Sequence, residues 1–143
     1  MLERTDWAPL IPHAGEMCLL DAVLAWDATT LHAISERHAA PTNPLRSARG
    51  LHAVHLAEYG AQAMAVHGAL EARARGDASV RQGRLVSLRE VMLAVDHVDP
   101  HAGRLDVHAE QLFADEAGAQ YAFRVEQAGR VLASGRATVI YVG

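Results

Sequence analysis

The sequence has little of several features, and each shortage excludes a class of protein. A single cysteine, Cys18, excludes an internal disulfide framework and is typical of a reducing cytoplasm. A net charge of −4, from 13 basic and 17 acidic residues, argues against a nucleic-acid partner. The chain does not open on a basic segment followed by an apolar core, so we expect no signal peptide. The longest strongly apolar run, Tyr59 to Leu70, is too short to cross a bilayer, and we expect a cytoplasmic protein without a membrane partner.

What is present is typical of a globular domain. Half of the 143 residues are hydrophobic and 21% are charged, a balance that favours a folded chain over a disordered one. The length is that of one domain with a sizeable core, and no repeat or low-complexity tract divides it. We therefore expect a single domain over residues 1–143.

Six segments have the composition and alternation of β-strands. Two precede an alanine-rich helix that begins near Leu51 and ends between Gly68 and Arg75, and four follow it. Prolines interrupt regular structure at the start of the loop that runs from Pro41 to Gly50. The expected strands are Met17–Trp26, Leu31–Arg37, Gly83–Val95, Leu105–Phe113, Tyr121–Val125 and Val131–Val142. This order predicts an α+β domain in which an antiparallel sheet of five to six strands wraps around one long central helix.

Glu58 is the most informative residue of the helix. No other formal charge occurs from residue 51 to residue 70, and apolar side chains surround the helix on every side. A carboxylate in such a place must be paired or hydrogen-bonded, or its pKa must rise until it is neutral. A carboxyl group with a raised pKa is a typical general acid. Gln62 lies one turn further along, where it can hold either Glu58 or the neighbouring loop.

Three segments resemble one family. They are Leu10–Val23 (LIPHAGEMCLLDAV), Glu58–Ala65 (EYGAQAMA) and Gly83–Val91 (GRLVSLREV). They are similar to motifs of the hotdog-fold 3-hydroxyacyl-acyl-carrier-protein dehydratases. The greatest similarity is to the dehydratase-like proteins of aryl-polyene and xanthomonadin-type pigment pathways.

This resemblance implies chemistry on an acyl thioester, with no cofactor. The substrate is a 3-hydroxyacyl chain on acyl carrier protein or coenzyme A, and elimination of water gives the 2-enoyl thioester. Glu58 corresponds to the family's helix carboxylate, which protonates the leaving hydroxyl. Backbone N–H groups at the helix start polarise the thioester carbonyl, which implies that Gly50, Leu51 and Gln62 line the substrate site. The family normally places the acyl tunnel at a dimer interface, so we expect a homodimer or a heterodimer with another hotdog protein.

The sequence differs from the family at the general base. The family's catalytic histidine lies about 14 residues before the carboxylate, and that offset falls on Pro44 here, between Asn43 and Leu45. His55, three residues before Glu58, can substitute as the base because both lie on one helical face. The alternative is that His55 is a hydrogen-bonded core histidine.

Several arginines flank the helix. Arg46 and Arg49 precede it and Arg84 follows it, with further arginines at positions 73, 75 and 81. We expect Arg46, Arg49 and Arg84 to contact the phosphates of coenzyme A or an acidic carrier protein; the alternative is an ordinary solvated surface. The other histidines lack ligand spacing and only one cysteine is present, so we expect no metal site.

Three functions agree with these features. The first is a 3-hydroxyacyl-thioester dehydratase. The second is a non-catalytic subunit that binds acyl chains or completes a heterodimer with an active dehydratase, which the missing loop histidine favours. The third is a hotdog acyl-CoA thioesterase, against which the LIPH opening of the chain argues.

Overall fold

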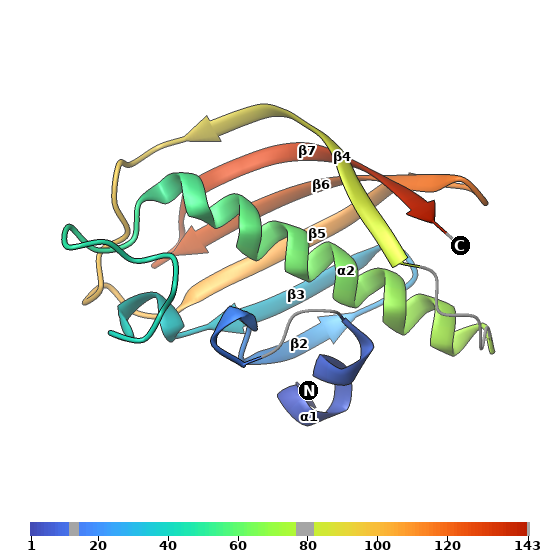
Figure 1. Ribbon diagram of the computed structural model, residues 1–143, viewed down its shortest axis with the longest axis horizontal. Coiled ribbons are helices and arrows are strands. Elements are labelled where there is room, and N and C mark those ends of the chain that lie inside the picture. Colours follow the sequence, from blue (N-terminus) through green and yellow to red (C-terminus); the bar gives the residue numbers. More distant parts are fainter. Residues whose placement is uncertain (12–14, 77–81, 143) are drawn as a thin grey trace.

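A computed structural model describes residues 1–11, 15–76 and 82–142, and every structural statement below refers to these residues. A seven-stranded antiparallel sheet curls around one long helix, α2 (Figure 1). The strand order is β1-β2-β3-β5-β6-β7-β4, so β1 and β4 are the edge strands. The bounds are β1 Leu2–Glu3, β2 Ala22–Trp26, β3 Thr30–Ser35, β4 Gln82–Leu93, β5 Leu105–Ala114, β6 Gly118–Gln127 and β7 Arg130–Val142. The predicted hotdog fold is confirmed.

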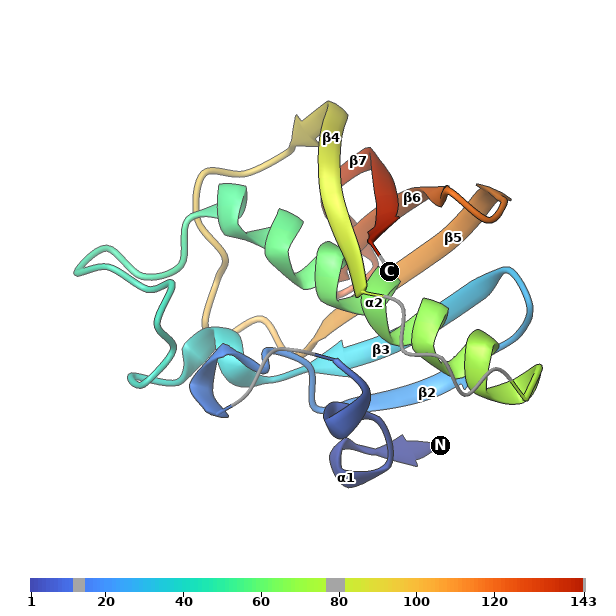
Figure 2. The ribbon, with the colours of Figure 1, turned by 45° about the vertical axis from the view of Figure 1, so that its right-hand side comes forward.

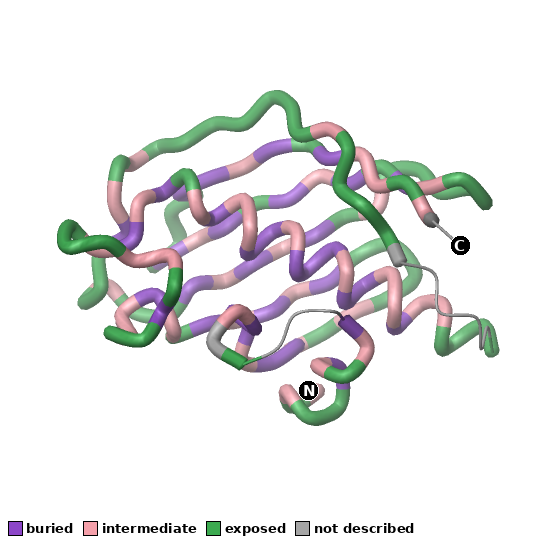
Figure 3. The backbone as a smooth tube through the Cα atoms, in the orientation of Figure 1, coloured by how far each residue is buried: buried purple, intermediate pink, exposed green. Residues whose placement is uncertain are grey.

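The helix starts with a short 3₁₀ turn, Ala53–His55, and continues as α2 over Leu56–Ala74. It packs against β3, β5, β6 and β7 but makes scarcely any contact with β4. Most residues of α2 are buried, whereas one stripe of residues stays partly exposed (Figure 3). This stripe consists mainly of Ala57, Glu58, Ala61, Ala65 and Ala69. Protein therefore covers the helix on all but one side.

Two glycines allow the helix and the sheet to approach each other around Phe123. A Cβ atom at Gly60 of α2 would lie 2.6 Å from the Phe123 ring, and one at Gly135 of β7 would lie 2.8 Å from it. Neither position can accept a larger residue without moving the ring. The buried ring of Phe123 thus fixes the distance between α2 and the centre of the sheet.

The loops follow the local chemistry of the sequence. In the hairpin between β6 and β7, Ala128 and Gly129 both have positive φ, at 51° and 78°. Two successive residues of this kind form a tight turn whose twist matches that of the strands. Residues 115–118 likewise connect β5 to β6 as neighbouring antiparallel strands, and residues 127–130 connect β6 to β7.

The starts of one strand and of the helix differ from the sequence prediction, and two short elements were not predicted. The expected strand from Met17 begins only at Ala22, because side chains elsewhere hold the backbone of residues 17–20. The helix begins at Ala53 instead of Leu51, since Leu51 bonds to Val98 in a bridge beside the helix. The strand β1 and the short helix α1 (Arg4–Trp7) carry too few residues to give a periodic signal.

The position of β7 agrees with its sequence. The segment Val131–Val142 is largely apolar on both faces, a pattern typical of a central strand, and β7 lies between β6 and β4. Among the described residues, no helix is both long and apolar enough to span a membrane.

Candidate functional site

The loop before the helix is held by a buried asparagine. Asn43 is 5% exposed, and its Nδ2 donates to the Tyr59 hydroxyl and to the Arg37 carbonyl oxygen, each at 3.0 Å. Its Oδ1 accepts from the Leu45 N–H at 2.9 Å. Burial raises the pKa of Tyr59 to about 12, so its hydroxyl stays neutral. Asn43, beside Pro44, therefore fixes the loop to α2, and its amide does not act as a base.

A tight turn then carries the chain to the helix. Ser47 and Gly50 exchange backbone hydrogen bonds of 2.9 and 3.0 Å, and Gly50 has a φ of 95°, which favours glycine. Leu51 is buried and its carbonyl oxygen accepts from Val98 N–H at 2.9 Å. Ala53 donates to the carbonyl oxygen of Asp96 at 2.7 Å. The backbone of residues 50–53 is consequently anchored on both sides.

The backbone N–H groups at the helix start divide into two sets. Those of Ala53, Val54 and His55 are used by the Asp96 carbonyl oxygen, His52 Nδ1 and the His52 carbonyl oxygen. Among the described residues, no acceptor is bonded to the N–H groups of Leu51 and His52. Any N–H group that the helix start offers to a substrate must therefore come from Leu51 or His52, not from the first turn.

Glu58 lies in the first turn of α2, on the partly exposed stripe. A carboxylate there interacts favourably with the positive end of the helix dipole. His55 is half-buried at the N-cap position, where the 3₁₀ turn joins α2, and it precedes Glu58 by three residues. Both side chains stand at the start of the helix, close in sequence to the Gly50–His52 backbone.

Gln62 proves to hold the N-terminal segment. It is fully buried; its Oε1 accepts from Leu19 N–H at 2.8 Å, and its Nε2 donates to the Met17 carbonyl oxygen at 2.6 Å. Ser35 Oγ completes the attachment by donating to the Leu19 carbonyl oxygen at 2.6 Å. From the sequence, Gln62 was expected to hold Glu58 or the loop before the helix; these contacts hold the N-terminal segment instead. Each end of its amide bonds to backbone and the side chain is fully buried, so Gln62 ties α2 to the N-terminal segment.

The predicted arginines do not form one patch. Arg46 is bound to its own loop, because its Nη1 donates to the Ala39 carbonyl oxygen at 2.6 Å, and Arg49 is exposed nearby. Arg84 lies near the start of β4, and β4 begins on the opposite side of the molecule from the loop at residues 41–50 (Figure 1). The length of β4 between Arg84 and Leu93 is roughly 30 Å. One carrier or phosphate group can contact Arg46 and Arg49, or it can contact Arg84, but not all three.

A second buried polar cluster was not predicted from the sequence. His67 Nε2 lies 3.0 Å from the carbonyl oxygen of Asp27, so this nitrogen carries the proton. His67 Nδ1 therefore accepts from the Tyr121 hydroxyl at 2.8 Å, and Gln111 Nε2 donates to that hydroxyl at 3.2 Å. Burial lowers the pKa of His67 and raises that of Tyr121. Its members are far apart in the chain, so the sequence gives no signal of this cluster. It lies beside the second half of α2.

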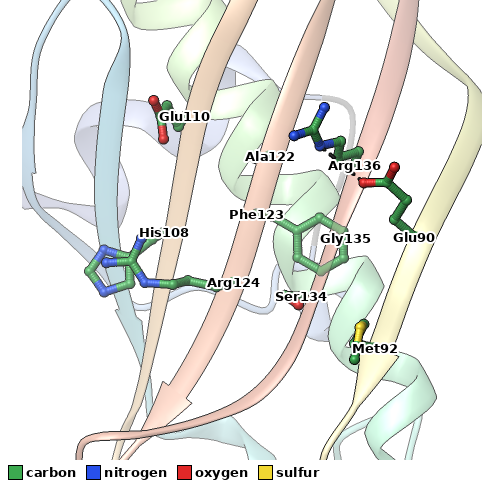
Figure 4. Close-up of a pocket in the computed structure, with 10 residues that line it drawn as sticks. All are labelled: Glu90, Met92, His108, Glu110, Ala122, Phe123, Arg124, Ser134, Gly135 and Arg136. Atoms are coloured by element: carbon green, nitrogen blue, oxygen red, sulfur yellow. Dashed lines mark ion pairs between the residues drawn. The ribbon is translucent and has the colours of Figure 1, made fainter.

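The outer face of the sheet carries a different set of charges. A hollow there lies between a Glu90–Arg136 ion pair of 3.2 Å and the side chains of His108 and Arg124 (Figure 4). His108 stacks on His32 with ring centroids 4.2 Å apart. Because side chains alternate along a strand, this face points away from α2 and Glu58. The described residues contain no cluster of three side chains suited to hold a metal ion.

Comparison with known proteins identifies a family. A family model described as ApeP-like, ApeP dehydratase, matches residues 5–142. No curated protein sequence matches the chain.

Solved structures with similar folds include dehydratases and thioesterases. A chain of the dehydratase heterocomplex ApeI:P from Xenorhabdus doucetiae is 24% identical, with a TM-score of 0.83, over 94% of this chain and 89% of that one. A mutant thioesterase from Staphylococcus aureus is 12% identical, with a TM-score of 0.64, over 85% and 93%. A mutant phenylacetic acid degradation protein PaaI from Thermus thermophilus is 20% identical, with a TM-score of 0.58, over 84% and 91%. At these identities the likeness shows the fold.

Proposed function

This chain belongs to the ApeP-like dehydratase family, and on that premise we propose that it acts in the elimination of water from 3-hydroxyacyl thioesters. The observation that carries the proposal is the start of α2. Glu58 stands there on the partly exposed stripe, six residues after His52, and no described acceptor uses the backbone N–H groups of Leu51 and His52. An acid and two N–H donors are the groups that such an elimination needs besides a base.

The proposed reaction assigns one role to each group. The Leu51 and His52 N–H groups donate to the thioester carbonyl oxygen and stabilise the negative charge that develops when the α-proton leaves. The electron pair of the broken C–H bond forms the C2–C3 double bond, while the C3–O bond breaks. Protonated Glu58 gives its proton to the departing hydroxyl, so that water and the 2-enoyl thioester are released.

His55 is our candidate for the base. It is half-buried and precedes Glu58 by three residues, and the loop position of the family histidine is occupied by Asn43 and Pro44. His13, in the motif at the start of the chain, lies outside the described residues and is the histidine to compare with it experimentally.

A non-catalytic subunit is the second candidate function. The observation that favours it is Asn43, whose amide is fully engaged in holding the loop where the family carries its histidine. In this case the chain binds the acyl group or completes the site of another subunit. We propose in either case that it works with a second hotdog chain, as its relative does in the ApeI:P heterocomplex.

One assay distinguishes these functions. The chain, alone and with a second hotdog subunit, is incubated with 3-hydroxyacyl and 2-enoyl thioesters of coenzyme A and acyl carrier protein. Enoyl absorbance and free thiol are followed together. Interconversion of the two thioesters without thiol release supports the dehydratase, and loss of it in His55→Ala but not His13→Ala supports His55 as the base. Thiol release instead would establish a thioesterase, and no reaction under any condition would leave the binding subunit.

A further inference from the structure

We propose that His52 is a positioning residue for the proposed reaction, and that it acts only while its imidazole ring is neutral. The ring holds the backbone at the start of the helix, in the segment whose Leu51 and His52 N–H groups we assign to the thioester carbonyl oxygen. The inference rests on the proposed function for the identity of the substrate. The hold itself rests on the contacts of the His52 ring and on the tautomer that they require.

The His52 side chain caps the start of the helix. It occupies the N-cap position of the 3₁₀ turn Ala53–His55, with an extended backbone, and its Nδ1 accepts a hydrogen bond from the Val54 N–H at 3.0 Å. Such caps are usually made by the side-chain oxygen of Ser, Thr, Asn or Asp. The hydroxyl and amide oxygens among these accept whatever the pH, whereas an imidazole nitrogen accepts only while it carries no proton. A histidine in this position makes the cap depend on protonation.

A second histidine lies against the first. The connection between β4 and β5 passes beside the start of α2, in both views of the molecule (Figures 1 and 2). Residues 51–53 and 96–98 meet there in an antiparallel bridge in which His52 is paired with His97, flanked by backbone hydrogen bonds of 2.9 and 2.7 Å. The two rings meet edge to face, with centroids 5.0 Å apart and planes at 75°. This contact suits two neutral rings, because two imidazolium ions at that distance would repel each other.

Among the described residues, no acidic side chain makes an ion pair or a hydrogen bond with His52 or His97. The charged or titratable groups along the neighbouring elements are His55 and Glu58 of the helix, Asp96, Asp99 and His101 of the connection to β5, and Arg130 at the start of β7. The cap is therefore not replaced by an ion pair when His52 takes up a proton.

Protonation of His52 releases the segment that we assign to the substrate. The protonated Nδ1 is a donor, so the Val54 N–H loses its acceptor, and the positive ring opposes the positive end of the helix dipole. The Leu51 and His52 N–H groups lie three and two residues before Val54, so their direction is set in part by this cap. Since imidazoles gain a proton near about pH 6.5, the hold is present above that pH and is lost progressively below it. The reaction thus loses its N–H donors as the pH falls, independently of the state of Glu58.

Nuclear magnetic resonance of the folded protein tests the hold without any substrate. At pH 7.5 the His52 ring should carry its proton on Nε2, because Nδ1 is the acceptor. Between pH 7.5 and pH 5.5 we expect the protection of the Val54 amide against hydrogen exchange, corrected for the intrinsic rate, to fall about tenfold. The fall should disappear in His52→Asn, whose amide oxygen caps at either pH, and remain in His97→Phe, which keeps a ring beside His52. A proton on Nδ1 at pH 7.5 or the same fall in His52→Asn would overturn the proposal, as would loss of the fall in His97→Phe.

Turnover as a function of pH, in the assay described above, connects the hold to the reaction. At pH 7.5 we expect His52→Asn to be about five to ten times as active as His52→Ala, which has no cap. From pH 7.5 to pH 5.5 the activity of His52→Asn relative to the native protein should rise about tenfold, because only the native cap is lost. A ratio that stays constant with pH would overturn the positioning role, since a merely structural histidine would give that result. Absence of turnover in all of these proteins would count against the proposed function, while the Val54 amide would still decide the inference about His52.

Discussion

At the scale of single residues, the buried side chains of this protein mostly hold backbone in place. Gln62 joins α2 to Met17 and Leu19, and Asn43 joins the loop to Tyr59. Neither contact is visible in the sequence, because each links residues far apart in the chain. Glu58 could be singled out from the sequence because a lone charge in an apolar helix is a local anomaly.

Replacing Gln62 by leucine tests its structural role. The change leaves the Leu19 N–H and the Met17 carbonyl oxygen without their partner, and we expect the free energy of unfolding to fall by about 2–4 kcal/mol. The control is Gln120→Leu on the exposed face of β6, which should change it by less than about 0.5 kcal/mol. Urea denaturation measures both. Equal effects of the two substitutions would contradict the role assigned to Gln62.

His67 should make stability depend on pH. Burial lowers its pKa in the folded state, whereas the unfolded chain has the ordinary value of about 6.5. The unfolded state thus binds more protons below that value, so the stability present at neutral pH is lost as the pH falls below about 6.5. One such group contributes a slope of at most about 1.4 kcal/mol per pH unit. Urea denaturation at pH 7 and pH 5 should show a shallower dependence in His67→Gln, and an unchanged one in His101→Gln, which alters an exposed histidine. The same slope in both variants would refute this assignment.

At the scale of elements, the strands and the long helix could be predicted from periodicity, whereas their ends could not. The ends depend on capping and tertiary contacts, such as His52 Nδ1 accepting from Val54 N–H and Asp96 accepting from Ala53 N–H. The exposure of β4 was not predicted either, because its apolar sequence is equally typical of a buried strand. The apolar residues of this segment predict a strand. Only the order of strands in the sheet shows that β4 lies at an edge, with one side unpaired.

The loop from Pro41 to Gly50 should loosen when its attachment to α2 is cut. Tyr59→Phe removes the hydroxyl that accepts from Asn43 Nδ2, at a cost of about 1–2 kcal/mol to the closed loop. We expect native-state trypsin cleavage after Arg49 to become roughly 5–30 times faster. The control is Tyr121→Phe, which removes a buried hydroxyl on β6 and should leave cleavage in this loop unchanged. Equal acceleration in both variants would mean that the loop opens only with the whole fold.

At the scale of the whole molecule, the sheet has one open apolar edge and the helix has one partly exposed stripe. Both features agree with the second hotdog chain that we propose as a partner. The fold and the family were reached from the order of elements and three motifs. The motifs do not show which edge of the sheet is exposed. The structure does, and the residues exposed there are available to a partner. The proposed site at Glu58 lies on the uncovered side of α2, so we expect substrate to be processed by the assembled pair.

The most direct test of the central claim is the rate at which the assembled pair interconverts 3-hydroxyacyl and 2-enoyl thioesters, with Glu58→Gln set against Glu71→Gln. Both glutamates lie on α2 and are partly exposed, but only Glu58 stands at the start of the helix. General acid catalysis predicts a loss of about 10²–10⁴-fold in Glu58→Gln, with association and unfolding unchanged, and nearly full activity in Glu71→Gln. Full activity in Glu58→Gln would show that Glu58 is not the general acid.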